Sequence, residues 1–244
     1  MFFYKSSAYD KWCEKVYGKA LKQSGMVTYK ELEIMFEKIE LKPDSFILDI
    51  GCGLGGMTDE IARHYSSKAI GIDIDENMIV NARSTYKNRN DLEFKVMDAA
   101  LIGSDNNKYD LICMLDTVYF NTTPDMLFKF LDSCLECLNT NGKIAVFSSY
   151  VPDNGLNIYP LNYNEKIKGW REEQNIIVES VCLSDDFKNF WCNAYDACLE
   201  LNKIMQAEIP DSYEKLLIKC SEFSNISRRN PEKMSRWLNI ISHI

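Results

Sequence analysis

Residues Phe46 to Gly56 read FILDIGCGLGG, a run of apolar residues that leads directly into a cluster of glycines. The apolar run is typical of a buried strand, and glycines allow the backbone of the following turn to approach a ligand closely. A helix is predicted at residues 57–66, and the free N–H groups at its start would face that ligand. The stretch therefore predicts a strand, a glycine-rich turn and a helix arranged around a small-molecule site.

Strands and helices alternate on both sides of this turn. Apolar runs predict strands at residues 46–50, 68–73, 92–96, 109–115 and 142–149, and later at 176–182 and 236–242. Helices are predicted at residues 9–22, 28–39, 57–66, 76–87, 124–138, 164–174, 185–206 and 211–224, with an irregular loop at 151–163. Thr28 and Glu31 form a capping-box pattern at the start of the second helix. The alternation indicates an α/β protein with a parallel sheet.

The composition argues against several classes of function. The chain has 244 residues, and its 28 basic and 36 acidic residues give a net charge of −8, which disfavours a nucleic-acid surface. No apolar run approaches the ~20 residues of a membrane span, and none at the N-terminus has signal-peptide length, so a cytoplasmic location is expected. The nine cysteines are odd in number, and Cys134 and Cys137 read as helix residues rather than as a metal or redox pair. With only two histidines, neither a histidine triad nor a metal site is expected.

The glycine turn alone is compatible with two nucleotide ligands. It satisfies G-x-G-x-x-G, so a dinucleotide such as NAD must be considered, and Asp73 at the next strand end would bind a ribose in either case. Asp49 favours the other ligand, because a carboxylate beside the turn suits an ammonium group and is a poor neighbour for a pyrophosphate. Asp98 follows the third strand, where it can accept a hydrogen bond from an adenine amino group. These acidic residues favour a nucleoside that carries an ammonium group.

The ordered set of motifs resembles the class I S-adenosylmethionine-dependent methyltransferases, and an NAD enzyme is the less favoured alternative. The motifs that carry the resemblance are Ile47–Gly56, Gly71–Ile74, Asp98 and Tyr109–Ile112. The resemblance implies an α/β, Rossmann-like, seven-stranded and mostly parallel sheet with helices on both faces and an antiparallel last strand. It also implies an N-terminal helical lid at residues 1–40, a cofactor-binding core at 41–150, and a helical substrate cap at 151–244 that includes the last two strands.

The resemblance further implies a set of residues that bind S-adenosylmethionine. Those expected to close over its carboxylate or to line its methionine end are Ser24, Gly25, Asp49, Gly51, Cys52 and Gly53. Those expected around the ribose, the adenine and the sulfonium are Asp73, Ile74, Met78, Asp98, Ala99 and Leu115.

The flanking segments resemble small-molecule methyltransferases that act on sarcosine, dimethylglycine or phosphoethanolamine. The similar stretches are Tyr17-Gly18 with Gln23–Gly25 near the start, and Lys233–Leu238 near the end. The phosphoethanolamine group has a histidine four residues after the aspartate that ends the fourth strand, whereas this chain has Asp116 followed by Phe120. The departure disfavours phosphoethanolamine itself as the acceptor.

Methyl transfer to an amine is the leading hypothesis, with Asp116 and Tyr119 as the catalytic residues at the acceptor. A carboxylate can hold the amine while it loses a proton, and aromatic faces attract methylated ammonium groups. One alternative is an O- or C-methyltransferase of a natural product or lipid precursor, which relies on proximity alone. A second alternative is a non-catalytic module that binds S-adenosylmethionine. The expected partner is a small-molecule acceptor, with no nucleic acid, no membrane and no metal, and the chain is expected to be a monomer or homodimer.

Overall fold

Seven strands form one sheet in the computed structural model of the chain, which describes residues 3–23, 25–104, 106–151, 161–172 and 175–244. The strands are β1 (Phe46–Ile50), β2 (Lys68–Asp73), β3 (Leu92–Val96), β4 (Tyr109–Leu115), β5 (Leu138–Tyr150), β6 (Ile176–Cys182) and β7 (Ser235–His243). The α-helices are α1 (Ser7–Tyr17), α2 (Tyr29–Lys38), α3 (Gly56–Tyr65), α4 (Glu76–Thr85), α5 (Pro124–Glu136), α6 (Tyr163–Glu172), α7 (Ser184–Glu200), α8 (Asn202–Glu208) and α9 (Pro210–Arg229). Short 3₁₀ helices are η1 (Phe3–Lys5), η2 (Ala99–Ser104), η3 (Val118–Phe120) and η4 (Pro231–Lys233).

The strand order is β3-β2-β1-β4-β5-β7-β6. All neighbours are parallel except β7, which runs antiparallel to β5 and to β6. The order reverses between β1 and β4, and open α/β sheets bind ligands at such a reversal, outside the carboxyl ends of the strands. The predicted seven-stranded sheet with an antiparallel last strand is confirmed.

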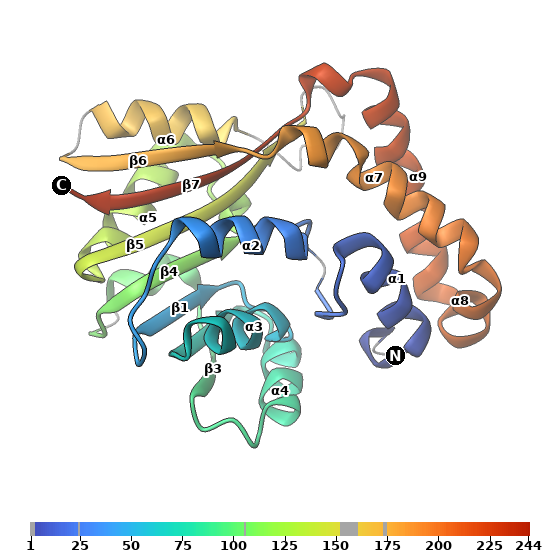
Figure 1. Cartoon of the computed structure of the whole chain (residues 1–244), viewed down its shortest axis with the longest axis horizontal. Helices are drawn as coiled ribbons and strands as arrows, with labels where there is room; N and C mark the ends of the chain where they lie inside the picture. Colours follow the sequence, from blue (N-terminus) through green and yellow to red (C-terminus); the bar gives the residue numbers. More distant parts are fainter. Residues whose placement is uncertain (1–2, 24, 105, 152–160, 173–174) are drawn as a thin grey trace.

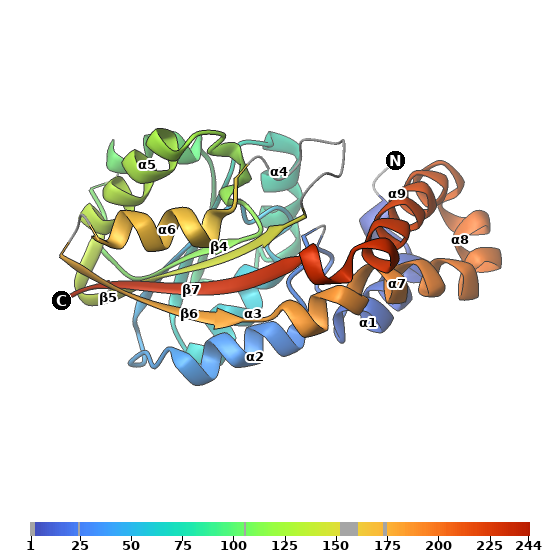
Figure 2. The same cartoon turned by 90° about the horizontal axis from the view of Figure 1, so that it is seen from above.

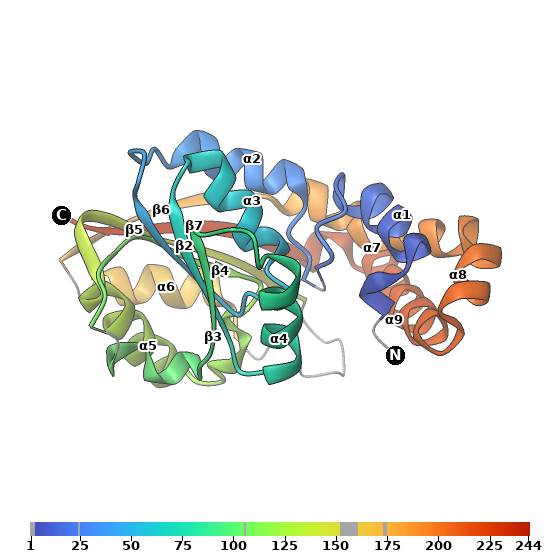
Figure 3. The ribbon, with the colours of Figure 1, turned by 90° about the horizontal axis from the view of Figure 1, so that it is seen from below.

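Two layers of helices cover the sheet. Helices α2 and α3 pack on one face and α5 and α6 on the other, as Figures 2 and 3 show from opposite sides. Side chains that alternate along β1 reach the two layers, with Ile47 in the first and Leu48 in the second. The central strands are nearly all apolar because both of their faces are covered.

Helix α4 packs against β2 and β3, and the other helices, α1, α7, α8 and α9, gather beyond the carboxyl ends of the parallel strands (Figure 1). Helix α1 packs with α7, α8 and α9 in a separate apolar cluster. In this cluster the rings of Trp191 and Phe223 are stacked, with their centroids 4.4 Å apart. We call this group of four helices the cap. Among the described residues, no helix is long and apolar enough to cross a membrane.

The observed elements differ from the sequence expectations mainly at helix ends. Helix α1 ends at Tyr17 instead of continuing to residue 22, because Gly18 takes a left-handed conformation with φ of 83°. The helix predicted at 185–206 is divided at Leu201 into α7 and α8, and α9 continues to Arg229. The capping box of Thr28 and Glu31 is present as predicted. Ser24 and most of the loop predicted at 151–163 lie outside the described residues.

Candidate functional site

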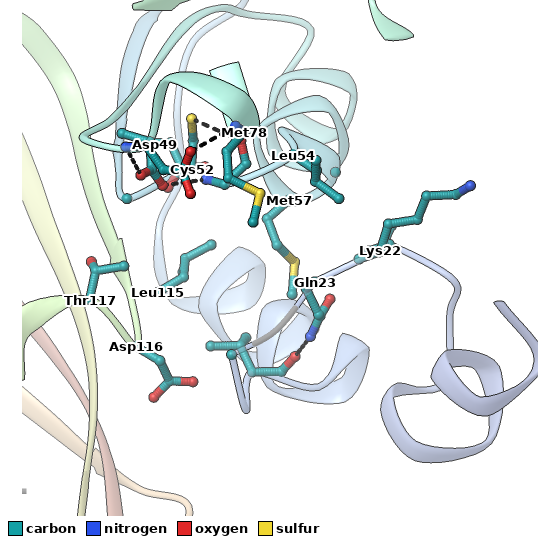
Figure 4. Close-up of a pocket in the computed structure, with 18 of the residues that line it drawn as sticks. Lys22, Gln23, Asp49, Cys52, Leu54, Met57, Met78, Leu115, Asp116 and Thr117 are labelled. Carbon is teal, nitrogen blue, oxygen red and sulfur yellow. Dashed lines mark hydrogen bonds between the residues drawn. The ribbon is translucent and has the colours of Figure 1, made fainter. Parts of the chain in front are cut away.

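A cavity of about 440 Å³ lies at the carboxyl ends of β1, β2 and β4. Its volume is within the range of about 300–1,000 Å³ that is usual for small-molecule sites. The lining residues include eight of the predicted cofactor-binding residues, namely Gly25, Asp49, Gly51, Cys52, Gly53, Asp73, Met78 and Leu115, and also Asp116. Figure 4 shows how the side chains from the strand ends and from the N-terminal segment surround the space.

Asp49 is the buried acid of this cavity. It is the penultimate residue of β1 and is 1% exposed. Its Oδ2 accepts a hydrogen bond of 2.6 Å from Thr58 Oγ1. Its Oδ1 has no hydrogen-bond partner among the described residues. Burial raises the pKa of Asp49 to about 6, against the lowering effect of the Thr58 hydroxyl. A buried carboxylate oxygen without a donor is costly, so this position suits a ligand that brings a positively charged donor.

The glycine turn leaves space for a ligand. A methyl group added at Gly53 would meet nothing within 4 Å, although its φ of 53° still favours glycine. Helix α3 begins at this turn with Gly55 as its N-cap, and within the described part of the chain no side chain caps its first N–H groups. Asp73, at the end of β2, lies beside the turn: its Oδ2 accepts from the N–H of Gly53 at 2.9 Å and its Oδ1 accepts from the N–H of Asp75. A helix start suits an anion and a carboxylate suits hydroxyl donors, so the cavity offers a position for each kind of group.

An N-terminal segment closes one side of the cavity. We call residues 19–23 and 25–27 the closing segment; Leu21, Gln23, Gly25 and Val27 within it line the cavity. The hydroxyls of Tyr9 and Tyr17 in α1 donate to the backbone carbonyls of Gln23 and Gly25, at 2.8 and 2.9 Å. These two hydrogen bonds therefore connect helix α1 of the cap to the segment that lines the cavity.

Asp116 follows β4 and faces the cavity beside Leu115 (Figure 4). Its side chain is 2% exposed, and its backbone has a φ of 61°. Oδ1 accepts from Arg236 Nη1 at 2.8 Å and from the Tyr119 hydroxyl at 3.1 Å. Oδ2 accepts from the backbone N–H of Met26 at 2.7 Å and from Arg236 Nη2 at 3.1 Å. Each oxygen of Asp116 thus already accepts two hydrogen bonds.

Tyr119 lies in η3 and contacts Asp116 without lining the cavity. Its hydroxyl donates to Asp116 and accepts from the backbone N–H of Ser149 at 2.8 Å. Its ring packs edge-on against Tyr163, with ring centroids 5.4 Å apart. Tyr119 is not among the residues that line the cavity, so its hydroxyl supports Asp116 rather than facing the open space.

Three predicted adenine-side residues also lie outside the cavity lining. Ile74 is 72% exposed at the end of β2, and Asp98 is exposed after β3, where its Oδ1 accepts from the N–H of Ala100. Ala99 begins η2 and is half-buried. Their role in adenine binding stays a prediction.

Sequence reasoning missed several residues of the site. Tyr4, Met57 and Thr117 line the cavity although they were not proposed as site residues, and so do Gln23 and Leu54, which stand inside quoted motifs but were given no role. It also missed the buried pair of Glu31 and Arg236 behind Asp116. Arg236 stands inside the stretch Lys233–Leu238 that carries the family resemblance, but nothing in its sequence context indicates the buried pair.

Comparisons with known proteins agree with this geometry. A model described as a methyltransferase domain matches residues 47–142. Phosphoethanolamine N-methyltransferase 1 of Arabidopsis thaliana is 29% identical over 178 residues, which cover 68% of this chain and 35% of that protein. The chain therefore spans about a third of the length of the plant relatives that it matches.

Solved structures share the fold at low sequence identity. Phosphoethanolamine N-methyltransferase 2 of Haemonchus contortus, in complex with phosphomonomethylethanolamine and S-adenosylhomocysteine, superposes with a TM-score of 0.77 at 16% identity, over 99% of this chain and 59% of that chain. The cyclopropane synthase MmaA2 of Mycobacterium tuberculosis gives a TM-score of 0.75 at 12% identity, over 95% and 93% of the two chains. The domain match, the strand order and the glycine turn with its buried acid together show a methyltransferase domain at residues 47–142, within a chain that has the class I methyltransferase fold.

Proposed function

We propose that the chain transfers a methyl group from S-adenosylmethionine to an amine nitrogen of a small molecule. The observation that carries the proposal is the unpaired, buried Oδ1 of Asp49 in a cavity of about 440 Å³. An ammonium group on the ligand would supply the missing donor and the opposite charge.

The residues present fit S-adenosylmethionine. Asp49 would hold the ammonium group of its methionine part, and the uncapped start of α3 suits the carboxylate. Asp73 would accept from the ribose hydroxyls, with Met78 beside them in the lining. The open space at Gly53 lets the ligand approach the backbone. When bound, S-adenosylmethionine supplies a methyl carbon that is activated by the positive sulfur.

The chain's own contribution to the reaction is alignment and charge. Asp116 is held as one rigid group by Arg236, Met26 and Tyr119, and it lines the cavity next to Leu115. Because each of its oxygens already accepts two hydrogen bonds, we propose that Asp116 attracts the protonated amine by its charge and that Tyr119 fixes the carboxylate for this purpose. The amine then releases its proton to solvent, and its free lone pair attacks the methyl carbon. Alignment of the acceptor with the methyl carbon then supplies most of the rate enhancement.

An amine acceptor is supported by the names of the relatives, which are N-methyltransferases. Phe120 stands where the phosphoethanolamine group has a histidine, so we propose an amine other than phosphoethanolamine. We also propose a cytoplasmic location, a monomer or homodimer without nucleic acid, and the division into a lid at residues 1–40, a core at 41–150 and a cap region at 151–244.

A turnover assay with methyl-labelled S-adenosylmethionine tests the proposal. The acceptor panel would contain ethanolamine and its N-methyl derivatives, phosphoethanolamine, sarcosine, phenols and carboxylic acids. We expect labelled product and S-adenosylhomocysteine with an amine, and much less of both with Asp49→Asn at a cofactor concentration below the wild-type Kd. Cofactor binding without turnover across the panel would instead identify a non-catalytic module, and turnover only with phenols or carboxylic acids would overturn the amine.

A further inference from the structure

A fully buried ion cluster lies behind the cavity. Arg236 is 0% exposed, and its guanidinium pairs with Glu31 at 2.5 Å and with Asp116 at 2.8 Å. The exposed fractions of these two carboxylate side chains are 3% and 2%. One cation thus lies between two carboxylates, and burial raises the pKa of Glu31 against the lowering effect of Arg236. Replacement of such a cluster by apolar residues is often neutral or stabilising, so overall stability alone does not account for it.

The surroundings fix the guanidinium of Arg236 in a single position. Its carbon lies 5.8 Å from the ring centroid of Phe147 in β5 and 5.5 Å from that of Phe187 in α7. Nη1 also donates to the Ser149 hydroxyl at 2.8 Å. The backbone of Arg236 is paired as well, because Leu183 N–H donates to its carbonyl at 2.8 Å. The side chain of Arg236 is therefore held by β5 and α7, independently of the closing segment.

The cluster reaches the closing segment through two connections. On one side, Asp116 Oδ2 accepts from Met26 N–H at 2.7 Å, and Gly25 lies so close that an added methyl group would be 3.5 Å from the Asp116 side chain. On the other side, Glu31 caps the start of α2, where its Oε2 accepts from Thr28 N–H at 2.9 Å. Both ends of residues 25–28 are thus held by carboxylates that share Arg236.

We infer that Arg236 is a positioning residue, which acts through Asp116 and Glu31 to hold the closing segment across the cofactor cavity. It does not line the cavity itself. Loss of Arg236 would leave two buried carboxylates that repel each other. The hydrogen bond from Met26 N–H to Asp116 would then break, and the closing segment would move. The part of this inference that concerns cofactor affinity rests on the proposed function, whereas the part that concerns the closing segment does not.

The test compares Arg236→Lys, Arg236→Met and a control, Lys30→Ala. Lysine keeps the positive charge but lacks the planar guanidinium that donates hydrogen bonds to both carboxylates, whereas methionine removes the charge. Lys30→Ala removes a cation next to Glu31 in α2, because Lys30 pairs with Asp186 in α7, but that pair is exposed. Two quantities are measured: hydrogen–deuterium exchange of the Met26 and Val27 amides without ligand, and the Kd for S-adenosylhomocysteine.

We expect both quantities to rise at least tenfold in Arg236→Lys, while exchange in β1 and β4 and both quantities in Lys30→Ala stay unchanged. If Arg236→Met does not fold, Arg236→Lys carries the test. Unchanged exchange at Met26 in a folded Arg236→Lys protein would overturn the inference, whatever happens to its melting temperature. Failure of the wild-type protein to bind S-adenosylhomocysteine would remove the proposed function, and the exchange measurement would still decide the role of Arg236.

Discussion

At the scale of single residues, we predict that the charge of Asp49 strengthens cofactor binding and lowers the stability of the ligand-free protein. A charged carboxylate at this position is desolvated, and its pKa of about 6, raised by burial from 3.8, measures that cost. Asp49→Asn should therefore increase the free energy of unfolding of the ligand-free protein at neutral pH by up to about 3 kcal/mol. It should also raise the Kd for S-adenosylhomocysteine at least tenfold, because a charge-assisted hydrogen bond is lost. Urea unfolding and calorimetric titration measure the two effects.

The matched control is Asp110→Asn. Asp110 lies in the neighbouring strand β4 but at its opposite end, where it accepts from Phe46 N–H and from Asn139. This change should leave the Kd unaltered. An unaltered Kd in Asp49→Asn as well would refute the assignment of Asp49 to the ammonium group.

The same residue gives cofactor binding a pH dependence. The folded-state pKa of Asp49 lies above that of the unfolded chain, so the folded protein takes up this proton first as the pH falls. Its destabilising contribution is present above about pH 6 and disappears as the pH falls toward 4. The ammonium group binds only the ionised form, so the Kd should rise about tenfold for each unit below about pH 6. Asp49→Asn should give a flat profile over the same range, and an equal slope in both proteins would contradict the prediction.

At the scale of secondary structure, the contact between the closing segment and α3 requires glycine. A methyl group at Gly56 would lie 1.9 Å from the backbone carbonyl oxygen of Leu21, which cannot move without the closing segment. Gly56→Ala should therefore weaken cofactor binding at least tenfold, as measured by titration calorimetry. In contrast, Gly169 in α6 is exposed and has nothing within 4 Å, so Gly169→Ala should stabilise the protein by about 0.5–1 kcal/mol and leave the Kd unchanged. An unchanged Kd in Gly56→Ala would show that the segment does not close the cavity.

The strands could be predicted from the sequence more accurately than the helices of the cap. Strands such as β2 and β4 are covered on both faces, so they appear as continuous apolar runs with sharp ends. Helix α1 was predicted to be too long because the pattern does not reveal that Gly18 adopts a left-handed conformation. Arg236 could not be assigned at all. Its role depends on the pairing of β7 with β5 opposite Ser149, which brings residue 236 beside residues 31 and 116.

The residues at the acceptor show a second limit of sequence reasoning. A carboxylate at the end of β4 has the same sequence context whether its oxygens are free or occupied. Only the structure shows that Met26, Tyr119 and Arg236 fill both oxygens of Asp116. We therefore keep as a proposal that Asp116 orients the acceptor, which is the role expected from the sequence for a carboxylate that holds the amine while it loses a proton.

At the scale of the whole molecule, the cofactor cavity draws on both parts of the fold. Its lining includes Tyr4 near the cap, Gly25 in the closing segment, and Asp49, Asp73 and Leu115 in the sheet. A ligand that binds only this assembled arrangement should stabilise the protein as one unit. At a concentration about 100 times its Kd, S-adenosylhomocysteine should add about 2.7 kcal/mol to the free energy of unfolding.

For a chain of this length, that gain should raise the thermal unfolding midpoint by about 5–10 °C in a single transition. Scanning calorimetry with increasing S-adenosylhomocysteine measures the shift. Asp49→Asn, at the same ligand concentration, should start from a higher midpoint and shift less. Two transitions, of which only one moves with ligand, would show that the cap helices α7–α9 unfold separately from the sheet. The contacts of Arg236 with α2, β4 and β5 argue against such a separation, because β7 carries this residue directly after the cap.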